Sequence, residues 1–312
     1  MQVEVRSHAR LHFGFLDLSG QRGREFGGFG LAISRPRDVL RFEPARRLQV
    51  EGEQAERVER LAARFHEVFG LPSRGRVHVL EAIPEHVGLG SGTQLALAVA
   101  AGLGRLHGIE QPPAGLCAAM GRARRSGVGY HLFQNGGFVV EGGHRRRADA
   151  APPLLARHDF PEDWHIVIAI PSATERVSGE AEEEAFRRLR PAPSGTAEQI
   201  AQVVLMQLLP ALVERDLPAF GAGLAEAQEL VGSCFAAVQD GTFHPGAMRL
   251  IHALKESAGC GVGQSSWGPA VYALAADDRE QARIESIVRR ADPAAVLLAA
   301  RGWNRGAAIE SS

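Results

Sequence analysis

Alternating apolar and polar residues open the chain and predict a β-strand over residues 2–13. One face of this strand carries Val3, Val5, Ala9, Leu11 and Phe13. The opposite face carries His8, Arg10 and His12. The apolar face is expected to be buried, whereas the two histidines around an arginine either face solvent or belong to a polar site.

Hydrophobic periodicity assigns most of the remaining chain to short strands and amphipathic helices. Further strands are expected at residues 38–43, 47–51, 77–83, 164–171 and 296–299. Helices are expected at residues 54–69, 113–125, 180–190, 196–209, 216–231, 245–258 and 279–291. The Ala/Pro-rich stretch 148–153 is the best linker, which predicts domains at 1–150 and 151–312. The element order after the linker is typical of a ferredoxin-like α+β domain.

A glycine-rich loop joins the strand at 77–83 to a helical period formed by Leu95, Val99, Leu103 and Leu106. Glycines in such a loop let the backbone approach a ligand closely. The N–H groups and the dipole of the first helical turn favour an anion. We therefore expect phosphate or diphosphate at Gly88, Leu89, Gly90, Ser91, Gly92 and Thr93. The alternative interpretation is a tight turn whose Ser91 or Thr93 caps the helix.

Two well-known nucleotide-binding patterns do not match this loop. A Walker loop requires a lysine after its last glycine, and none follows here. The dinucleotide pattern G-x-G-x-x-G is also absent, because the glycines alternate at 88, 90 and 92.

Composition narrows the possible functions. The chain has 312 residues, 45% hydrophobic and 23% charged, which is ordinary for a globular protein. A net charge of −1 gives no reason to expect nucleic acid or an anionic membrane as a partner. No run is expected to span a membrane, so the cytoplasm is the default location. Three scattered cysteines, Cys117, Cys234 and Cys260, are expected to be isolated buried thiols. The only lysine is Lys255, which argues against Schiff-base chemistry elsewhere.

Two further glycine-rich segments carry polar residues that ordinary turns do not require. Asp17 and Arg24 lie in a predicted hairpin that continues through the glycines at 27, 28 and 30. Gln264, Ser265 and Ser266 lie in a glycine-rich turn before an apolar strand. They are suited to hydrogen-bond a phosphate or an aryl carboxylate; otherwise they satisfy their own backbone.

The loop P-x-x-x-G-L-G-S-G at 84–92 resembles the phosphate loop of the GHMP kinase superfamily. The segments S-H-A-R-L-H-F at 7–13, S-G-V-G at 126–129 and G-Q-S-S-W-G-P at 263–269 more closely resemble the β-ribofuranosylaminobenzene 5′-phosphate synthases of that superfamily. The resemblance implies a two-domain α+β fold: an α/β N-terminal domain holding the phosphate loop and a ferredoxin-like C-terminal domain.

The chain departs from the kinases of this superfamily at two positions. Their catalytic aspartate falls in an S-G-x-D segment, where this sequence has Gly129. Their first-strand lysine has Arg10 as its nearest equivalent. The synthases share the S-G-V-G pattern, so these departures favour a synthase.

The resemblance implies a decarboxylating phosphoribosyl transfer. It would join 5-phosphoribosyl-1-pyrophosphate to 4-aminobenzoate, or a close hydroxybenzoate analogue, with loss of pyrophosphate and CO₂. Such a step belongs to methanopterin-type cofactor biosynthesis. The resemblance also implies Mg²⁺, no ATP and a homodimer.

On this reading we assign the isolated charged residues to the chemistry. Asp17 would stabilise an oxocarbenium-like centre or contact Mg²⁺, and Ser91 or Thr93 are alternative metal ligands. Arg24 and Arg10 would bind phosphate or carboxylate. His12 would contact substrate; the roles of His8, His12 and His131 are otherwise open. The two competing hypotheses are an ATP-dependent GHMP small-molecule kinase and a non-catalytic binding protein.

Overall fold

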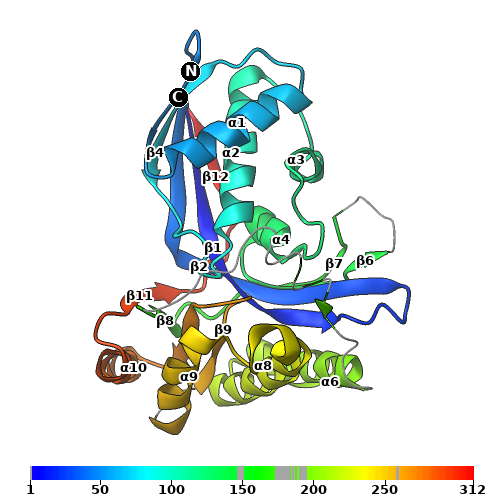
Figure 1. Cartoon of the computed structure of the whole chain (residues 1–312), viewed down its shortest axis with the longest axis vertical. Coiled ribbons are helices and arrows are strands. Elements are labelled where there is room, and N and C mark those ends of the chain that lie inside the picture. Colours follow the sequence, from blue (N-terminus) through cyan, green and yellow to red (C-terminus); the bar gives the residue numbers. More distant parts are fainter. Residues whose placement is uncertain are drawn as a thin grey trace.

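The computed structural model describes residues 2–145, 151–172, 184, 186, 188, 189, 195–257 and 260–312. Two long strands, β1 and β2, descend through the N-terminal half of the molecule and then bend to lie along the C-terminal half (Figure 1). The expected strand at 2–13 is β1, which extends to Asp17 and buries its odd-numbered face as predicted. The expected hairpin is also present, because β1 and β2 pair antiparallel along most of their length.

The larger sheet has eight strands, with the path β12-β1-β2-β4-β3 and with β5, β6 and β7 joined alongside β2. Its strands are β1 (Val3–Asp17), β2 (Arg24–Glu43), β3 (Leu48–Gly52), β4 (Gly75–Glu81), β5 (Phe138–Glu141), β6 (His144–Arg145), β7 (Leu154–His158) and β12 (Ala308–Ser311). Two of them, β7 and β12, come from beyond residue 150. The last strand brings the chain ends together, since Gln2 and Ser312 exchange backbone hydrogen bonds.

Helices pack on this sheet in the N-terminal half (Figure 1). They are α1 (Ala55–Val68), α2 (Ser91–His107), α3 (Pro113–Ala119) and α4 (Val128–Asn135). The apolar stripes of α1 and α2 share one core with β1, β2 and β4. The period-3.6 pattern predicted α1 and α2 correctly, whereas α4 was not anticipated.

The C-terminal half is built on an antiparallel sheet of order β11-β8-β10-β9. Its strands are β8 (His165–Ile170), β9 (Cys260–Gln264), β10 (Val271–Ala275) and β11 (Val296–Arg301). Its helices are α6 (Thr196–Val203), the π-helix η1 (Val204–Leu208), α7 (Leu209–Glu214), α8 (Leu217–Gln239), α9 (Pro245–Ser257) and α10 (Asp278–Ala291). The predicted helix at 180–190 lies mostly outside the described residues. The predicted two-domain α+β architecture is confirmed.

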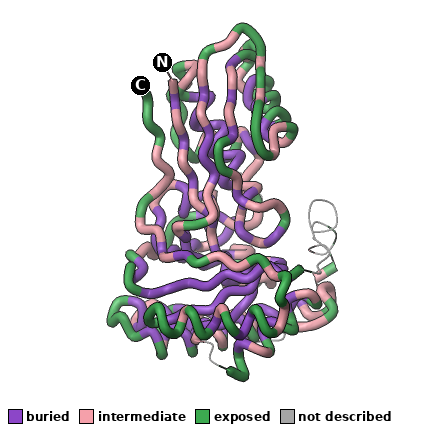
Figure 2. Tube along the Cα trace, turned by 90° about the vertical axis from the view of Figure 1, so that its left-hand side faces the viewer, coloured by how far each residue is buried: buried purple, intermediate pink, exposed green. Residues whose placement is uncertain are grey.

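Both faces of the smaller sheet are covered. Ile166, Ile168 and Ile170 on one face of β8 join the core that contains Phe13 and Phe220. Val167 and Ala169 on the other face join the core under α9 and α10. A strand that is buried on both faces has an unbroken run of apolar residues, as residues 166–170 show. Figure 2 shows these buried strands between more exposed segments.

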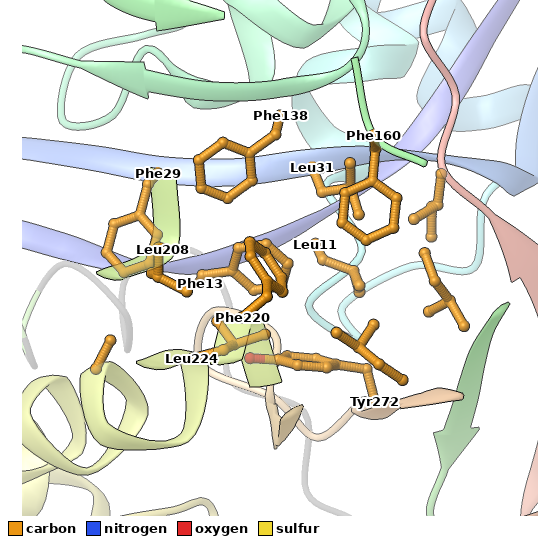
Figure 3. Packing of buried hydrophobic residues seen from close by; sticks show 14 of the residues in the cluster. Leu11, Phe13, Phe29, Leu31, Phe138, Phe160, Leu208, Phe220, Leu224 and Tyr272 are labelled. Carbon is orange, nitrogen blue, oxygen red and sulfur yellow. The ribbon is translucent and has the colours of Figure 1, made fainter. Parts of the chain in front are cut away.

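One aromatic core joins the two halves (Figure 3). Phe13 on β1 contacts Phe29, Phe138 and Tyr272, with ring centroids 5.2–6.2 Å apart. Because β1 contributes to this core and to the one beneath α2, it holds both halves in a fixed relation.

The sequence led us to expect no stretch of membrane-spanning length, but the helix Thr196–Glu214 reaches that length and has a mean hydropathy of 1.3. Length and composition alone are weak grounds for a membrane span. Ile200, Val204 and Leu208 point from it into the main core, which explains its apolar composition. One side of this helix therefore packs on the core, whereas its Leu205, Met206 and Val213 are exposed.

Candidate functional site

The glycine loop ends at Gly90, the residue before helix α2. Gly90 has φ of 83°, and no side chain caps the helix. Its carbonyl accepts the N–H groups of Thr93 and Gln94 at 3.1 and 3.2 Å. The earlier N–H groups of the first turn are therefore available to an anion, as expected from the sequence. The interpretation in which Ser91 or Thr93 caps the helix is wrong for this structure.

The loop packs too closely for side chains at two of its glycines. A Cβ at Gly88, whose φ is +87°, would overlap the carbonyl oxygen of Ser265. A Cβ at Gly90 would lie 2.8 Å from Cγ of Arg10. These contacts bring the phosphate loop against the first strand and against the third glycine-rich segment.

Ser265 is the residue that ties these three segments together. It is fully buried, and its Oγ donates to the Gly88 carbonyl at 2.7 Å. The same oxygen accepts the backbone N–H of His12 at 3.0 Å and Nη1 of Arg10 at 3.3 Å. Gln264 is also committed to the protein, since its side chain accepts from the backbone N–H of His244 and donates to the Ser266 carbonyl. Of the three, Ser266 is the one that lines the cleft.

A strongly basic cleft of about 440 Å³ opens at the start of α2. Its lining includes Gly88, Gly90, Ser91, Gly92 and Thr93 of the predicted phosphate loop. It also includes five arginines: Arg10, Arg57, Arg122, Arg124 and Arg125. None of the described residues that line it is an aspartate or glutamate. The arrangement suits a polyanionic ligand.

Two of these arginines lie close to the N-terminus of α2. Nη2 of Arg57 and Nη1 of Arg122 both lie 3.5 Å from the position of a Cβ at Gly92. Arg57 is oriented by Gln54, whose Oε1 accepts from Nη1 at 2.9 Å. Nε of Arg122 is buried and has no partner among the described residues. Burial, and then the charges of Arg57 and Arg64, lower the pKa of Arg122, so an anion here would relieve an unfavourable environment.

The sequence missed these arginines because the predicted helix at 113–125 ends early. Helix α3 stops at Ala119, and Gly121 has φ of +64°. The N–H groups of Gly121 and Arg122 bond back to the carbonyls of Ala118 and Cys117, which is the Schellman pattern of helix termination. Gly121 was the signal that could have predicted this end. The arginines that follow therefore lie in a loop over the cleft.

A second, smaller cavity adjoins the basic cleft. Its volume is about 30 Å³, and the two share His12, Phe15, Ser266 and Trp267. Most of its lining is apolar, including Phe13, Val231, Phe235 and Phe243. The site thus has a basic part and an apolar part that meet at His12.

His12 is almost fully buried between these two parts. Its Nε2 lies 3.0 Å from Oγ of Ser126. Burial, and then the charge of Arg10, lower the pKa of His12 to about 3, so the imidazole is neutral at physiological pH. Oγ of Ser126 lies 3.4 Å from Oε1 of Glu141.

Asp17 and Arg24, which we assigned to chemistry, do not line either cavity. Oδ1 of Asp17 accepts from the backbone N–H and the hydroxyl of Ser19, both at 2.6 Å. Arg24 donates to the carbonyls of Gly142 and Gly143 at 2.5 and 2.7 Å. Their assigned roles stay predictions.

The other two histidines of open role are held by structural contacts. His8 stacks on Trp303 with ring centroids 4.0 Å apart, and its Nδ1 lies 3.2 Å from the Ser34 carbonyl. Burial lowers the pKa of His8 to about 4. His131 is buried on α4, and its Nε2 lies 2.7 Å from the Pro152 carbonyl.

No cysteine or lysine is among the described residues that line the cleft. Cys117 and Cys234 are buried free thiols, as expected, whereas Cys260 is only partly buried. Lys255 pairs with Glu229 and lies 4.9 Å from the Phe243 ring centroid.

Comparison with known proteins finds relatives along the whole chain. Residues 56–139 match the family described as GHMP kinases N terminal domain, and residues 208–294 match GHMP kinases C terminal. The β-ribofuranosylphenol 5′-phosphate synthase of Methanothermobacter thermautotrophicus is 32% identical, with 98% of each chain covered. The protein of the same name from Archaeoglobus fulgidus is 36% identical, with 87% of each chain covered. The chain belongs to the β-ribofuranosylphenol 5′-phosphate synthase family. Like the other members of this family, it is an enzyme.

Solved structures agree on the fold. The mevalonate kinase of Methanococcus jannaschii superposes with a TM-score of 0.69, covers 96% of this chain and 98% of its own, and is 12% identical. A putative homoserine kinase from Listeria monocytogenes gives 0.68, with 99% and 100% covered and 16% identity. At these identities the likeness concerns the GHMP fold and not the reaction.

Gly129 lies where α4 meets α2. A Cβ at Gly129 would lie 3.2 Å from Cγ2 of Thr93, so Thr93 occupies the space into which a side chain at 129 would project. Gly129 is one of the two positions at which this sequence departs from the kinase motifs, and the other, Arg10, lines the basic cleft. The kinase hypothesis is therefore less supported than the synthase.

The residues of the cleft do not form a resident magnesium site. Among the described residues no group of three or more His, Cys, Asp or Glu side chains is placed to hold a metal. The cleft offers the hydroxyls of Ser91 and Thr93 but no carboxylate from its described lining. Mg²⁺ prefers oxygen ligands, keeps several waters and commonly binds through substrate phosphates. The donor set thus fits a metal already chelated by a ligand.

Proposed function

We propose that the enzyme transfers a phosphoribosyl group from 5-phosphoribosyl-1-pyrophosphate to a para-substituted benzoate, with release of pyrophosphate and CO₂. The observation that carries this proposal is the junction of an arginine-lined cleft with an apolar cavity at His12. A sugar diphosphate and an arene need these two environments side by side.

The diphosphate is assigned to the N-terminus of α2. Backbone N–H groups there, together with the nearby Arg57 and Arg122, would stabilise the charge that develops as the C1–oxygen bond breaks. Mg²⁺ is proposed to arrive on the diphosphate, and no role is assigned to ATP. Holding both substrates in line is the main contribution of the protein.

The arene is assigned to the end of the basic cleft that is lined by His12, Phe15 and Trp267, where the apolar cavity adjoins it. The relatives are named for a phenol product, which favours 4-hydroxybenzoate as acceptor here. The 4-aminobenzoate expected from the sequence is the comparison substrate. Either para group donates electrons to the ring carbon that carries the carboxylate, so this carbon attacks C1 of the ribosyl group.

The test is pyrophosphate and labelled CO₂ release from a mixture of phosphoribosyl pyrophosphate, Mg²⁺ and carboxyl-labelled arene without ATP. Equal amounts of both products are expected. Absence of both products, together with an ATP-dependent rise in melting temperature, would favour the kinase alternative instead. Size-exclusion chromatography with light scattering would test the homodimer, and cell fractionation the cytoplasmic location, which both remain proposals.

Arg122→Gln tests the assignment of the diphosphate. We expect KM for phosphoribosyl pyrophosphate to rise at least about tenfold, because a charge-assisted contact is worth roughly 1.5–3 kcal/mol. Arg60→Gln is the matched control, since Arg60 is exposed on α1 and does not line the cleft. An unchanged KM in Arg122→Gln would remove this arginine from the site.

A further inference from the structure

Glu141 is a buried carboxyl group to which the proposed function gives no role. It has no exposed surface, yet both of its oxygens are hydrogen-bonded. The backbone N–H of Gly127 donates to Oε1 at 3.0 Å, and that of Gly143 donates to Oε2 at 2.7 Å. Burial raises its pKa to about 7, although these N–H groups act in the opposite direction. Such a group exchanges a proton readily near neutral pH.

A continuous chain of polar contacts connects Glu141 with the site. Ser126 lies between Glu141 and His12, 3.4 Å from the carboxylate and 3.0 Å from Nε2 of the imidazole. Nδ1 of His12 has no hydrogen-bond partner among the described residues, and His12 lines both cavities. A neutral imidazole carries one donor and one acceptor nitrogen. With Nε2–H donating to Ser126, Nδ1 is the acceptor.

We propose that His12, Ser126 and Glu141 form a proton relay that removes the proton of the arene's para hydroxyl during ring attack and returns it after CO₂ leaves. This inference rests on the proposed phosphoribosyl transfer and deepens it. It makes His12 the catalytic residue in contact with the arene. Ser126 and Glu141 act through it.

The relay balances in both directions. The hydroxyl proton passes to Nδ1 of His12, the Nε2 proton passes to Ser126, and the Ser126 proton passes to Glu141. The O–H electron pair forms a quinoid C=O while the ring carbon bonds to C1 and the C1–diphosphate bond breaks. When the bond to the carboxylate breaks, its electron pair restores the ring, and the proton returns to oxygen by the same path. No proton is gained or lost, and His12 is never required to be cationic.

The neutral state of His12 fits this role. An imidazole with a strongly lowered pKa is a poor final proton acceptor, but it conducts a proton when each nitrogen has a partner. The 3.4 Å contact between Ser126 and Glu141 is long, and catalytic hydrogen bonds commonly shorten when substrate binds.

Ser126 also has a structural contact, because its Oγ accepts the N–H of Val128 at the start of α4 at 3.2 Å. The experiment must therefore separate a relay from a local packing effect. Substrates of different acidity distinguish the two explanations. Fluorine atoms next to the hydroxyl make 4-hydroxybenzoate more acidic, and an ionised phenol needs no proton acceptor.

The experiment compares kcat of the unmodified enzyme and of Ser126→Ala with 4-hydroxybenzoate and its 3-fluoro and 3,5-difluoro derivatives. With the parent arene we expect a loss of about 100-fold or more, in the range of general base catalysis. The loss should shrink to a few-fold with the difluoro arene or at high pH. Ser126→Thr should restore most of the activity, and Ser286→Ala on exposed α10 is the matched control.

A loss of equal size with every arene would overturn the relay while leaving the phosphoribosyl transfer intact. If the unmodified enzyme releases neither pyrophosphate nor CO₂ with any arene, the proposed function fails and the relay with it. If Ser126→Ala does not fold, His12→Gln gives the same readout, because it breaks the relay next to the substrate. Glu141→Gln should in addition remove an ionisation near pH 7 from the kcat profile; an unchanged profile would count against the relay.

Discussion

Asp38 is a second buried carboxyl group, and its environment makes its ionisation unfavourable. It is 1% exposed on β2, and burial raises its pKa to about 7 against the opposing effects of the Ile83 N–H and the Arg57 charge. Oδ1 accepts the Ile83 N–H at 2.8 Å, and the Ser7 hydroxyl lies 3.4 Å from Oδ2. The contact with Ile83 fixes the start of the segment that leads to the phosphate loop.

Asp38→Asn should make the unfolding free energy less sensitive to pH. The folded pKa is above the unfolded value, so the contribution of Asp38 to stability is complete below about pH 4 and is lost as pH rises through about 7. Asparagine keeps an acceptor for Ile83 and never ionises. In urea titrations at pH 8, the unfolding free energy of the variant should be higher than that of the unmodified protein by on the order of a few kcal/mol. At pH 4 the two unfolding free energies should be nearly equal.

The exposed Asp240 supplies a control, and Asp240→Asn should not change the pH dependence of unfolding. An Asp38→Asn variant that is less stable than the unmodified protein at both pH values would mean that the ionised carboxylate is required.

Single residues were the hardest feature to predict from the sequence. The glycine loop before α2 was predicted because its glycines and the helix after it leave a local pattern, and phosphate binding there stays a prediction. Arg57 reads locally as an ordinary charge on an amphipathic helix, and only the fold brings it to Gly92. For Arg24, the sequence did not show the contacts with the carbonyls of Gly142 and Gly143, and its assigned role stays a prediction.

Helix α2 packs so closely against β2 that one position in the contact has no room for a side chain. A Cβ at Gly102 would overlap the ring of Phe42, whereas a Cβ at Gly104, two residues later, would be 3.7 Å from its nearest neighbour. Both glycines are buried in the same helix. Replacing either glycine by alanine therefore changes the helix propensity equally, but the two replacements differ in their effect on packing.

Gly102→Ala should lower the melting temperature, because overpacking against Phe42 costs about 1–3 kcal/mol and outweighs the gain in helix propensity of about 1 kcal/mol. Gly104→Ala should leave the melting temperature unchanged or raise it. Thermal unfolding followed by circular dichroism measures both. Equal behaviour of the two variants would contradict the close contact between α2 and β2.

Elements were predictable where a periodic pattern of sufficient length stood alone. Helices α1, α9 and α10 were predicted within one or two residues, because their apolar stripes are regular. Helix α4 was missed since it is 8 residues long and begins inside a glycine-rich motif. Strand β12 was missed because its 4 residues carry little pattern, and pairing with β1 is what makes them a strand.

The whole molecule has a net charge of −1, yet its cleft gathers five arginines and, from its described lining, no acidic side chain. The sequence gives the net charge of the chain, but it does not show that the arginines gather in one cleft. The cleft combines segments around residues 10, 57, 88, 122 and 266, and only the packing of both halves brings them together. Ser265 connects these segments through its hydrogen bonds with the Gly88 carbonyl and the His12 backbone N–H.

The same charge distribution predicts how Mg²⁺ enters the reaction. A cleft lined by five arginines repels a free divalent cation but attracts one that is chelated by a diphosphate, since that complex remains anionic. Removal of Mg²⁺ with EDTA should therefore abolish pyrophosphate release and leave the melting temperature of the substrate-free enzyme unchanged. Millimolar Mg²⁺ should raise the melting temperature only when pyrophosphate is also present, by linkage to the bound complex. A saturable rise with Mg²⁺ alone would instead indicate a resident metal site, and Asp17 would be the first residue to substitute in locating it.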